Sequence, residues 1–215
     1  MRRHGWAGDL PASDEDAVER ILAATRTCID RDGASTGIVD VARELGVTRQ
    51  TVYRYYRTTE DLLTATAFSA TAPFLERLAS HLARRAWTPA EAVVEGIAFT
   101  LEELPQDPYL GLLLTPGRIS VVSRDFTSET AMTMGRAMIE RFPIDWSTYG
   151  FASADLDELV EQMLRMTQSL VVDPGTPPRK GAELRGYLSR WLAPAIDVKV
   201  STRSGASAKF TRFES

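Results

Sequence analysis

The segment from Val41 to Leu63, VARELGVTRQTVYRYYRTTEDLL, concentrates side chains that can bind nucleic acid. It holds four arginines and three tyrosines around one glycine. Arginine forms paired hydrogen bonds with phosphate or with the edge of guanine, and tyrosine hydroxyls bind phosphate. Between Arg43 and Arg57 these arginines are opposed by one acid, Glu44, although the whole chain has a net charge of -4. The segment is a basic patch in an acidic chain, which is typical of a DNA-binding surface.

The apolar residues of this segment predict two short helices joined by a tight turn. One stripe at helical spacing runs through Ile38, Val41, Ala42 and Leu45. Gly46 then supplies the turn, and Thr48 is the expected N-cap of the second helix. Val47, just before the cap, can pack on Val52 inside that helix. This pattern predicts a helix-turn-helix motif, although the turn alone does not exclude an ordinary helical hairpin with a solvated charged face.

The second short helix is expected to have one inward and one outward face. With Val52 and Tyr56 turned inward, the exposed residues are Arg49, Gln50, Tyr53 and Arg54. Arg49 can bind guanine, and Gln50 can bind adenine. Hydroxyls for phosphate contacts are offered by Thr48, Thr51, Tyr53 and Tyr55.

Helix signals recur through the rest of the chain, and no convincing alternating strand pattern appears, so we expect an all-α protein. Capping residues and breaks in the apolar period place further helices at about 13–33, 88–103, 153–172 and 180–196. Pro73 is expected to kink the helix that begins near Thr59. The stretch 198–215 is rich in small polar residues without a sustained period, and we expect it to be disordered.

The sequence argues against an enzyme. It contains two histidines, His4 and His81, no HExxH motif and no phosphate-cradling glycine loop, so neither a metal nor a cofactor is expected. The single cysteine, Cys28, falls in an apolar helical stripe and is expected to be a packed thiol. The absence of a long apolar run and of a secretion signal predicts a cytoplasmic protein. An enzyme and a dimeric helical adaptor that does not bind DNA remain as alternatives.

The pattern described above, with its preceding helix, covers about residues 13–65 and resembles the TetR family of bacterial one-component repressors. The resemblance implies a three-helix DNA-binding domain at 1–65 and a helical effector-binding and dimerisation domain at 66–197. It also implies that the protein binds a palindromic operator in double-stranded DNA as a homodimer, and that a small effector releases the homodimer from the operator. The operator, the target genes, the effector and the choice between repression and activation are not determined by the sequence.

The resemblance also implies roles for single residues. Arg49, Gln50 and Tyr55 would face bases or the groove wall, and phosphates would be bound by Thr48, Thr51 and Tyr53. Thr36 would cap the second helix and bring its N-terminus to the DNA backbone. In two places the sequence departs from the family pattern: the loop between Gly33 and Asp40 is a residue short, and Thr59 replaces a phosphate-binding lysine. Arg57, or an arm carrying Arg2 and Arg3, can supply the missing charge.

The larger C-terminal part offers candidates for an effector cavity and for a dimer interface. Methionine and aromatic side chains that can line a cavity are Trp87, Phe99, Tyr109, Met132, Met134, Met138, Phe142, Trp146, Tyr149, Met163 and Met166, although the same spacing also fits an ordinary core. No cluster of buried acids or arginines is evident, which favours an uncharged or amphipathic effector. The apolar face of the last helix, expected at the subunit interface, comprises Leu184, Leu188, Trp191 and Leu192.

Overall fold

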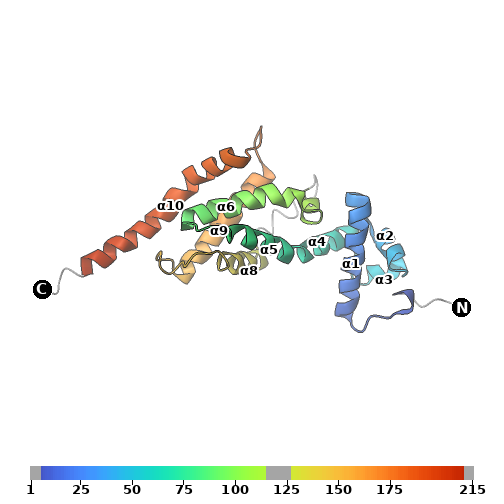
Figure 1. Ribbon diagram of the computed structural model, residues 1–215. Coiled ribbons are helices and arrows are strands. Elements are labelled where there is room, and N and C mark those ends of the chain that lie inside the picture. Colours follow the sequence, from blue (N-terminus) through green and yellow to red (C-terminus); the bar gives the residue numbers. More distant parts are fainter. Residues whose placement is uncertain (1–5, 115–126, 211–215) are drawn as a thin grey trace. The chain divides into compact units, whose positions relative to one another are not determined.

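The computed structural model describes residues 6–114 and 127–210, and every regular element in these ranges is a helix (Figure 1). The predicted all-α fold is therefore confirmed. The chain folds as two compact units. The first holds the residues up to Pro73 together with the segment that begins at Pro105, and the second holds Phe74–Leu104 and the C-terminal part. The boundary expected after residue 65 falls inside a helix of the first unit.

The first unit is a small helical domain with a short helical attachment. Its α-helices are α1 (Asp14–Asp32), α2 (Ile38–Glu44), α3 (Arg49–Tyr53) and α4 (Thr59–Ser69). Single turns of 3₁₀ helix are η1 (Trp6–Gly8) and η2 (Gly33–Ser35), and η4 (Leu110–Leu114) packs on α4. Figure 1 shows α2 and α3 beside α1 in this unit.

Local chemistry sets the ends of α1. The Ser13 hydroxyl accepts a hydrogen bond from the Asp16 N–H at 3.2 Å, and acids in the first turn complement the helix dipole. The helix ends at Gly33, whose φ of 63° is in the left-handed region that favours glycine. Its inner face packs Ile21 and Cys28 into the core of the unit, as the sequence predicted for the thiol. Burial raises the pKa of Cys28, which fits a packed rather than a reactive side chain.

The second unit is a bundle of longer helices. It contains most of α5 (Thr71–Leu82) and all of α6 (Pro89–Glu103), α8 (Glu129–Ile139), α9 (Ser153–Val172) and α10 (Gly181–Phe210). The first three residues of α5 belong to the first unit, as do the last two of the short η3 (Leu104–Gln106), which follows α6. The predicted capping box opens α6, where Thr88 accepts from the Glu91 N–H at 3.3 Å and donates its own N–H to the Glu91 carboxylate at 2.9 Å. Figure 1 shows α6 and α10 running alongside each other, and their contact is the most extensive in the unit.

Pro73 breaks a helix, as expected. The structure ends α4 at Ser69 and starts α5 at Thr71, so the predicted kink appears as a break at Ala70. Proline has no N–H, and Pro73 therefore cannot bond the carbonyl of Ser69 four residues earlier.

The prediction of a disordered tail is wrong for residues 198–210, because α10 continues to Phe210. Residues 211–215 lie outside the described part of the chain. Tertiary contacts hold the first residues of this stretch: Val200 packs against the core, and the Lys199 ammonium pairs with Asp155 near the start of α9. Among the described helices, none has the combined length and apolarity that a bilayer span requires.

Candidate nucleic-acid interface

A glycine turn joins α2 and α3 as the sequence predicted. Gly46 has a φ of 64°, and its N–H donates to the Arg43 carbonyl at 3.1 Å. The next N–H, that of Val47, donates to the Ala42 carbonyl at 2.9 Å. These bonds satisfy the last carbonyls of α2 while the chain reverses, so the two short helices form a helix-turn-helix.

Helix α3 is capped and anchored by the residues chosen from the sequence. The Thr48 hydroxyl accepts from the Thr51 N–H at 3.3 Å and lies 3.0 Å from the Thr51 hydroxyl. Val52 is fully buried in the core of the first unit, and the partly buried Val47 and Tyr56 pack against that core. The inward face of α3 is therefore the predicted one.

The opposite face of α3 is open to solvent. Arg49, Gln50, Tyr53 and Arg54 are all exposed, as the helical period predicted. Thr48 is also exposed although it serves as the cap, whereas Thr51 is half-buried. The exposed set combines a guanidinium and an amide, which can bind base edges, with hydroxyls and a second guanidinium, which can bind phosphate.

Tyr55 has a partner inside the first unit. Its ring packs partly against the core, and its hydroxyl donates to Asp14 Oδ1 at 2.9 Å. The guanidinium of Arg54 stacks over the same ring, with 4.7 Å from Cζ to the centroid, and its Nη2 donates to the Tyr55 hydroxyl. This hydrogen bond raises the pKa of Arg54. Sequence reasoning missed Asp14, which lies at the start of α1 and 41 residues from Tyr55.

The prediction that Thr36 caps α2 is wrong. Its side chain is 2% exposed, and its Oγ1 is buried without a hydrogen-bond partner. Gly37 occupies the N-cap position, where its N–H donates to Asp40 Oδ2 at 3.1 Å. The Thr36 hydroxyl therefore points into the domain and does not present a donor to a phosphate.

Thr59 lies at the start of α4, beside the N-terminus of α2. The cap of α4 is Thr58, which exchanges two hydrogen bonds with Asp61, so the Thr59 side chain has no capping role. A Cβ on Gly37 would lie 3.9 Å from Thr59 Oγ1, which places this hydroxyl next to the first amides of α2. Arg57 is exposed nearby in the chain, whereas Arg2 and Arg3 lie outside the described residues.

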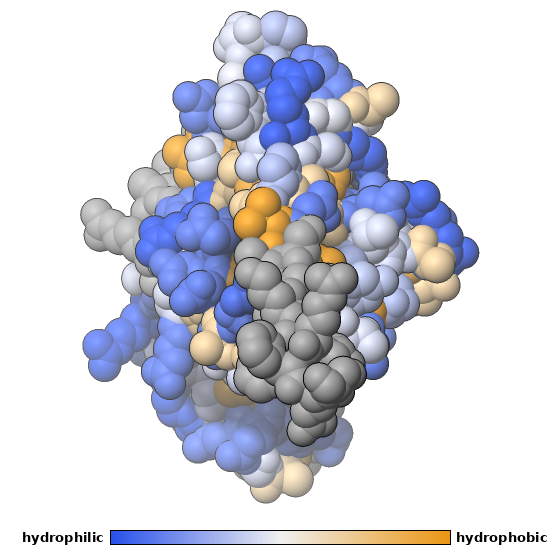
Figure 2. All heavy atoms as spheres, turned by 90° about the vertical axis from the view of Figure 1, so that its left-hand side faces the viewer, coloured by the Kyte–Doolittle hydropathy of each residue, from blue (hydrophilic) through white to orange (hydrophobic). Residues whose placement is uncertain are grey.

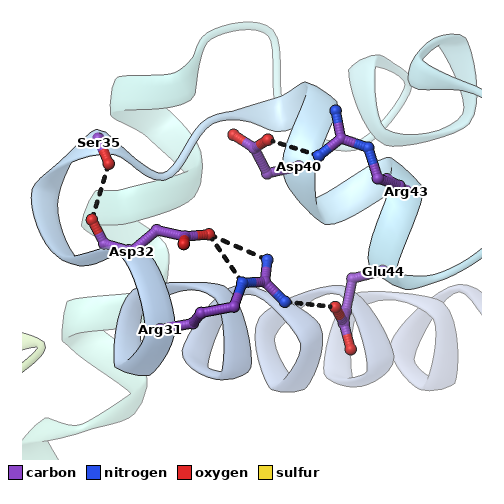
Figure 3. A pocket seen from close by; sticks show the side chains of 6 residues that line it. All are labelled: Arg31, Asp32, Ser35, Asp40, Arg43 and Glu44. Atoms are coloured by element: carbon purple, nitrogen blue, oxygen red, sulfur yellow. Dashed lines mark hydrogen bonds and ion pairs between the residues drawn. The ribbon is translucent and has the colours of Figure 1, made fainter.

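A polar hollow of about 670 Å³ lies where the end of α1 and η2 meet α2 (Figure 3). Its charged groups are paired with one another. Arg31 bonds Asp32 at 3.0 Å and Glu44 at 3.1 Å, and Arg43 bonds Asp40 at 3.2 Å. The Arg31–Glu44 pair ties α1 to α2, so we interpret this cluster as support for the motif.

The residues predicted to line an effector cavity lie mostly in the core of the second unit. Met138, Phe142 and Trp146 are buried there, and the partly buried members are Trp87, Phe99, Met132, Met134, Tyr149, Met163 and Met166. The prediction for Tyr109 is wrong, because it belongs to the first unit, where its hydroxyl donates to Asp30 at 3.0 Å. The Trp146 indole N–H donates to the Ile139 carbonyl at 2.9 Å, as expected for a residue fixed in a core.

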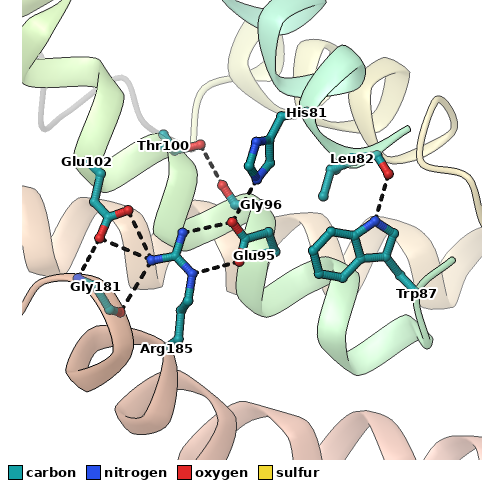
Figure 4. Close-up of polar contacts among 9 residues, drawn as sticks. All are labelled: His81, Leu82, Trp87, Glu95, Gly96, Thr100, Glu102, Gly181 and Arg185. Carbon is teal, nitrogen blue, oxygen red and sulfur yellow. Dashed lines mark hydrogen bonds and ion pairs between the residues drawn. The ribbon is translucent and has the colours of Figure 1, made fainter. Parts of the chain in front are cut away.

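A charged cluster in the second unit contradicts the expectation that no acids or arginines are buried together (Figure 4). Glu95 on α6 is 8% exposed. It accepts from Arg185 Nε and Nη2 of α10, both at 2.7 Å, and lies 2.8 Å from His81 Nε2. Arg185 Nη1 also donates to Glu102, at 3.0 and 3.1 Å. The signal in the sequence was an acid at position 95 inside an otherwise apolar helical run.

Two of the four predicted interface residues are not available for a partner. Leu188 is fully buried and Leu184 nearly so, and both belong to the core that α10 shares with α6. Their assignment to a subunit interface is wrong. Leu192 is half-buried, and Trp191 is 65% exposed.

Comparison with known proteins agrees with this geometry. A family model described as bacterial regulatory proteins of the tetR family matches residues 21–66, from α1 through α3 into α4. Two uncharacterized HTH-type transcriptional regulators of Mycobacterium tuberculosis, MT1294 and Rv1255c, are each 28% identical over 184 residues, which is 85% of this chain and 86% of each relative. Residues 21–66 are therefore similar to the TetR family of regulators.

The similarity is to proteins named as transcriptional regulators. Regulators of the family bind DNA, and they typically dimerise and bind small-molecule effectors. The TetR-family repressor AlkX of Dietzia sp. strain DQ12-45-1b has a related fold, with a TM-score of 0.55 at 20% identity over 84% of this chain and 96% of AlkX.

Proposed function

We propose that this protein is a TetR-family repressor that binds a palindromic operator as a homodimer and is released by a small uncharged or amphipathic molecule. The observation that carries the proposal is the exposed face of α3, on a helix held in place by buried Val52. A short helix fixed by a tight turn and anchored on one side can enter the major groove with its other side.

The exposed side chains divide by chemistry. Arg49 and Gln50 lie in the first turn of α3, where a recognition helix contacts base edges, and they suit guanine and adenine. Thr48 and Tyr53 offer exposed hydroxyls suited to phosphate. Arg54 closes α3 with an exposed guanidinium.

The proposed homodimer rests on apolar surface of α10. Trp191 is 65% exposed and Val198 62%, and seven residues, or about two helical turns, separate them. Figure 2 shows that hydrophobic residues reach the surface in small groups among hydrophilic ones on this side of the molecule. Covering an exposed tryptophan with a second copy would remove it from water. A two-fold dimer would place its two α3 helices about 34 to 36 Å apart, or a small multiple of that distance.

We propose an uncharged or amphipathic effector because the charged groups of the cluster described in the second unit are already paired with one another. Arg185 is paired with Glu95 and Glu102, so a charged ligand would have to displace an existing partner. Methionine and aromatic side chains of the core can adapt to an apolar ligand. We expect a cognate effector to lower DNA affinity through a coupling of about 1 to 3 kcal/mol. A thermal-shift comparison of medium-chain alcohols with carboxylates of equal length should favour the alcohols.

Footprinting on the DNA upstream of the protein's own gene tests the function. We expect a protected site with two-fold symmetry, and light scattering should give the mass of a dimer. Arg49→Ala should remove the protection, whereas Arg190→Ala, an equal loss of charge at an exposed position of α10, should not. A monomer that protects one half-site would contradict the dimer, and equal effects of the two variants would contradict a role for α3.

A further inference from the structure

Asp14, Arg54 and Tyr55 form a contact between the start of α1 and the end of α3. Asp14 is the first residue of α1, and Arg54 closes α3. The Tyr55 hydroxyl accepts from Arg54 Nη2 and donates to Asp14 Oδ1 at 2.9 Å. Arg54 Nη2 lies 3.9 Å from the same carboxylate oxygen. The three side chains therefore hold the guanidinium toward an acid on a different helix.

A carboxylate and a DNA phosphate compete for the same guanidinium. Both are anions whose oxygens accept hydrogen bonds from pairs of N–H groups. The N–H groups that Arg54 directs toward Asp14 are therefore not available to a phosphate at the same time. Stacking over the Tyr55 ring fixes the plane of the guanidinium and limits its freedom to turn away from Asp14. The Asp14 carboxylate is exposed at the domain surface, where it also repels an approaching phosphate.

We propose that Asp14 restrains Arg54 and thereby lowers the affinity of this regulator for all DNA sequences. Tyr55 is the positioning residue of this restraint, because its hydroxyl bonds both charged groups. The inference rests on the proposed function, since it takes α3 to be the DNA-binding helix. A backbone contact carries no sequence information, so releasing Arg54 strengthens binding to operator and random DNA alike.

The size of the effect follows from the exposure of the pair. An exposed ion pair contributes at most about 1 kcal/mol of free energy. Releasing Arg54 from such a pair should therefore raise the affinity for DNA at most about fivefold per subunit, or about 25-fold for a dimer. A guanidinium freed for a phosphate should also steepen the log-log dependence of affinity on salt by up to about 0.9 per subunit.

The test is Asp14→Asn, measured by fluorescence anisotropy across a salt series on an operator duplex and on a random duplex. Glu15→Gln is the matched control, because it removes an equal charge from the neighbouring exposed position of the same helix turn. We expect Asp14→Asn to bind both duplexes more tightly and with a steeper salt slope than Glu15→Gln. Far-ultraviolet circular dichroism should show the same helix content and melting temperature for both variants.

Arg54→Ala makes the test specific. If Asp14 acts through Arg54, the gain from Asp14→Asn disappears in the Arg54→Ala background. Equal gains in Asp14→Asn and Glu15→Gln, or a gain that persists without Arg54, would overturn the restraint while leaving DNA binding intact. A wild-type protein that binds neither duplex would refute the proposed function, and the restraint with it.

Discussion

Replacing Arg185 with methionine should strongly destabilise the second unit. Arg185 joins α10 to α6 by four hydrogen bonds to the carboxylates of Glu95 and Glu102. Methionine retains an unbranched side chain that can cover the same apolar surface but removes every donor. Glu95 would then remain buried, with His81 as the one remaining partner among the described contacts of its carboxylate.

The magnitude follows from burial and from the partners that remain. Removing one member of a buried pair costs about 3 to 5 kcal/mol, because the other charge is left without compensation. The lower end applies here, since the Arg185 and Glu102 side chains are 30% and 28% exposed and water can solvate them in part. A loss of about 3 kcal/mol in a chain of this size lowers the melting temperature by about 6 to 12 °C.

The loss should depend on pH in a defined direction. Burial raises the pKa of Glu95, but the hydrogen bonds and charges of Arg185 and His81 outweigh burial and lower it. In the wild type, Glu95 therefore contributes stability above its unfolded pKa, and this contribution disappears as pH falls through the lowered folded pKa. Without Arg185, burial raises the folded pKa, so the variant loses stability at neutral pH and recovers part of it when Glu95 is protonated. The difference in free energy of unfolding between wild type and Arg185→Met should therefore narrow as pH falls from about 7 to about 4.

Thermal and urea denaturation of both proteins across this pH range test the prediction. Arg190→Met is the control, because it makes the same replacement at an exposed position of the same helix. We expect Arg190→Met to change the free energy of unfolding by no more than about 0.5 kcal/mol. Equal melting temperatures for Arg185→Met and Arg190→Met, or a difference from wild type that widens as pH falls, would refute the reasoning.

Three further predictions concern α3, the start of α4 and the cap of α6. Gln50→Ala should change the preferred base in binding-site selection, whereas Tyr53→Phe should weaken all sequences similarly; an unchanged preference for Gln50→Ala would argue against a base contact. Thr59→Lys should add a phosphate contact beside α2 and steepen the salt slope by about 0.9 per subunit, on operator and random DNA alike; an unchanged slope would mean that another residue already neutralises that phosphate. Thr88→Ala should lower the free energy of unfolding by about 1 kcal/mol, because it removes the hydrogen bond from the Glu91 N–H to the capping hydroxyl. Thr88→Ser keeps a capping hydroxyl and should keep most of that stability; urea denaturation measures both variants.

Interactions between near neighbours in the chain could be predicted from the sequence. Ser13 and Thr88 cap α1 and α6 as expected, because a capping hydroxyl bonds an amide three residues ahead. The Gly46 turn and the buried Val52 were likewise visible, since glycine allows a positive φ and helical period places the apolar residue inward. The family match at residues 21–66 covers this same local motif.

The prediction that Thr36 caps α2 failed because the cap position is occupied by the next residue, Gly37. Thr36 is buried and Gly37 is the cap, because the Asp40 carboxylate bonds the Gly37 N–H.

Tertiary structure decided the contacts between distant parts of the chain. Glu95 and Arg185 are 90 residues apart, and their pairing depends on α10 packing along α6. The same packing buries Leu188 and leaves Trp191 exposed, although both belong to one apolar helix face in the sequence. An amphipathic pattern shows that a helix has a face to bury, but it does not identify the surface that covers that face. That choice depends on how whole helices fit together, so the burial of α10 against its own chain was settled only by the folded structure.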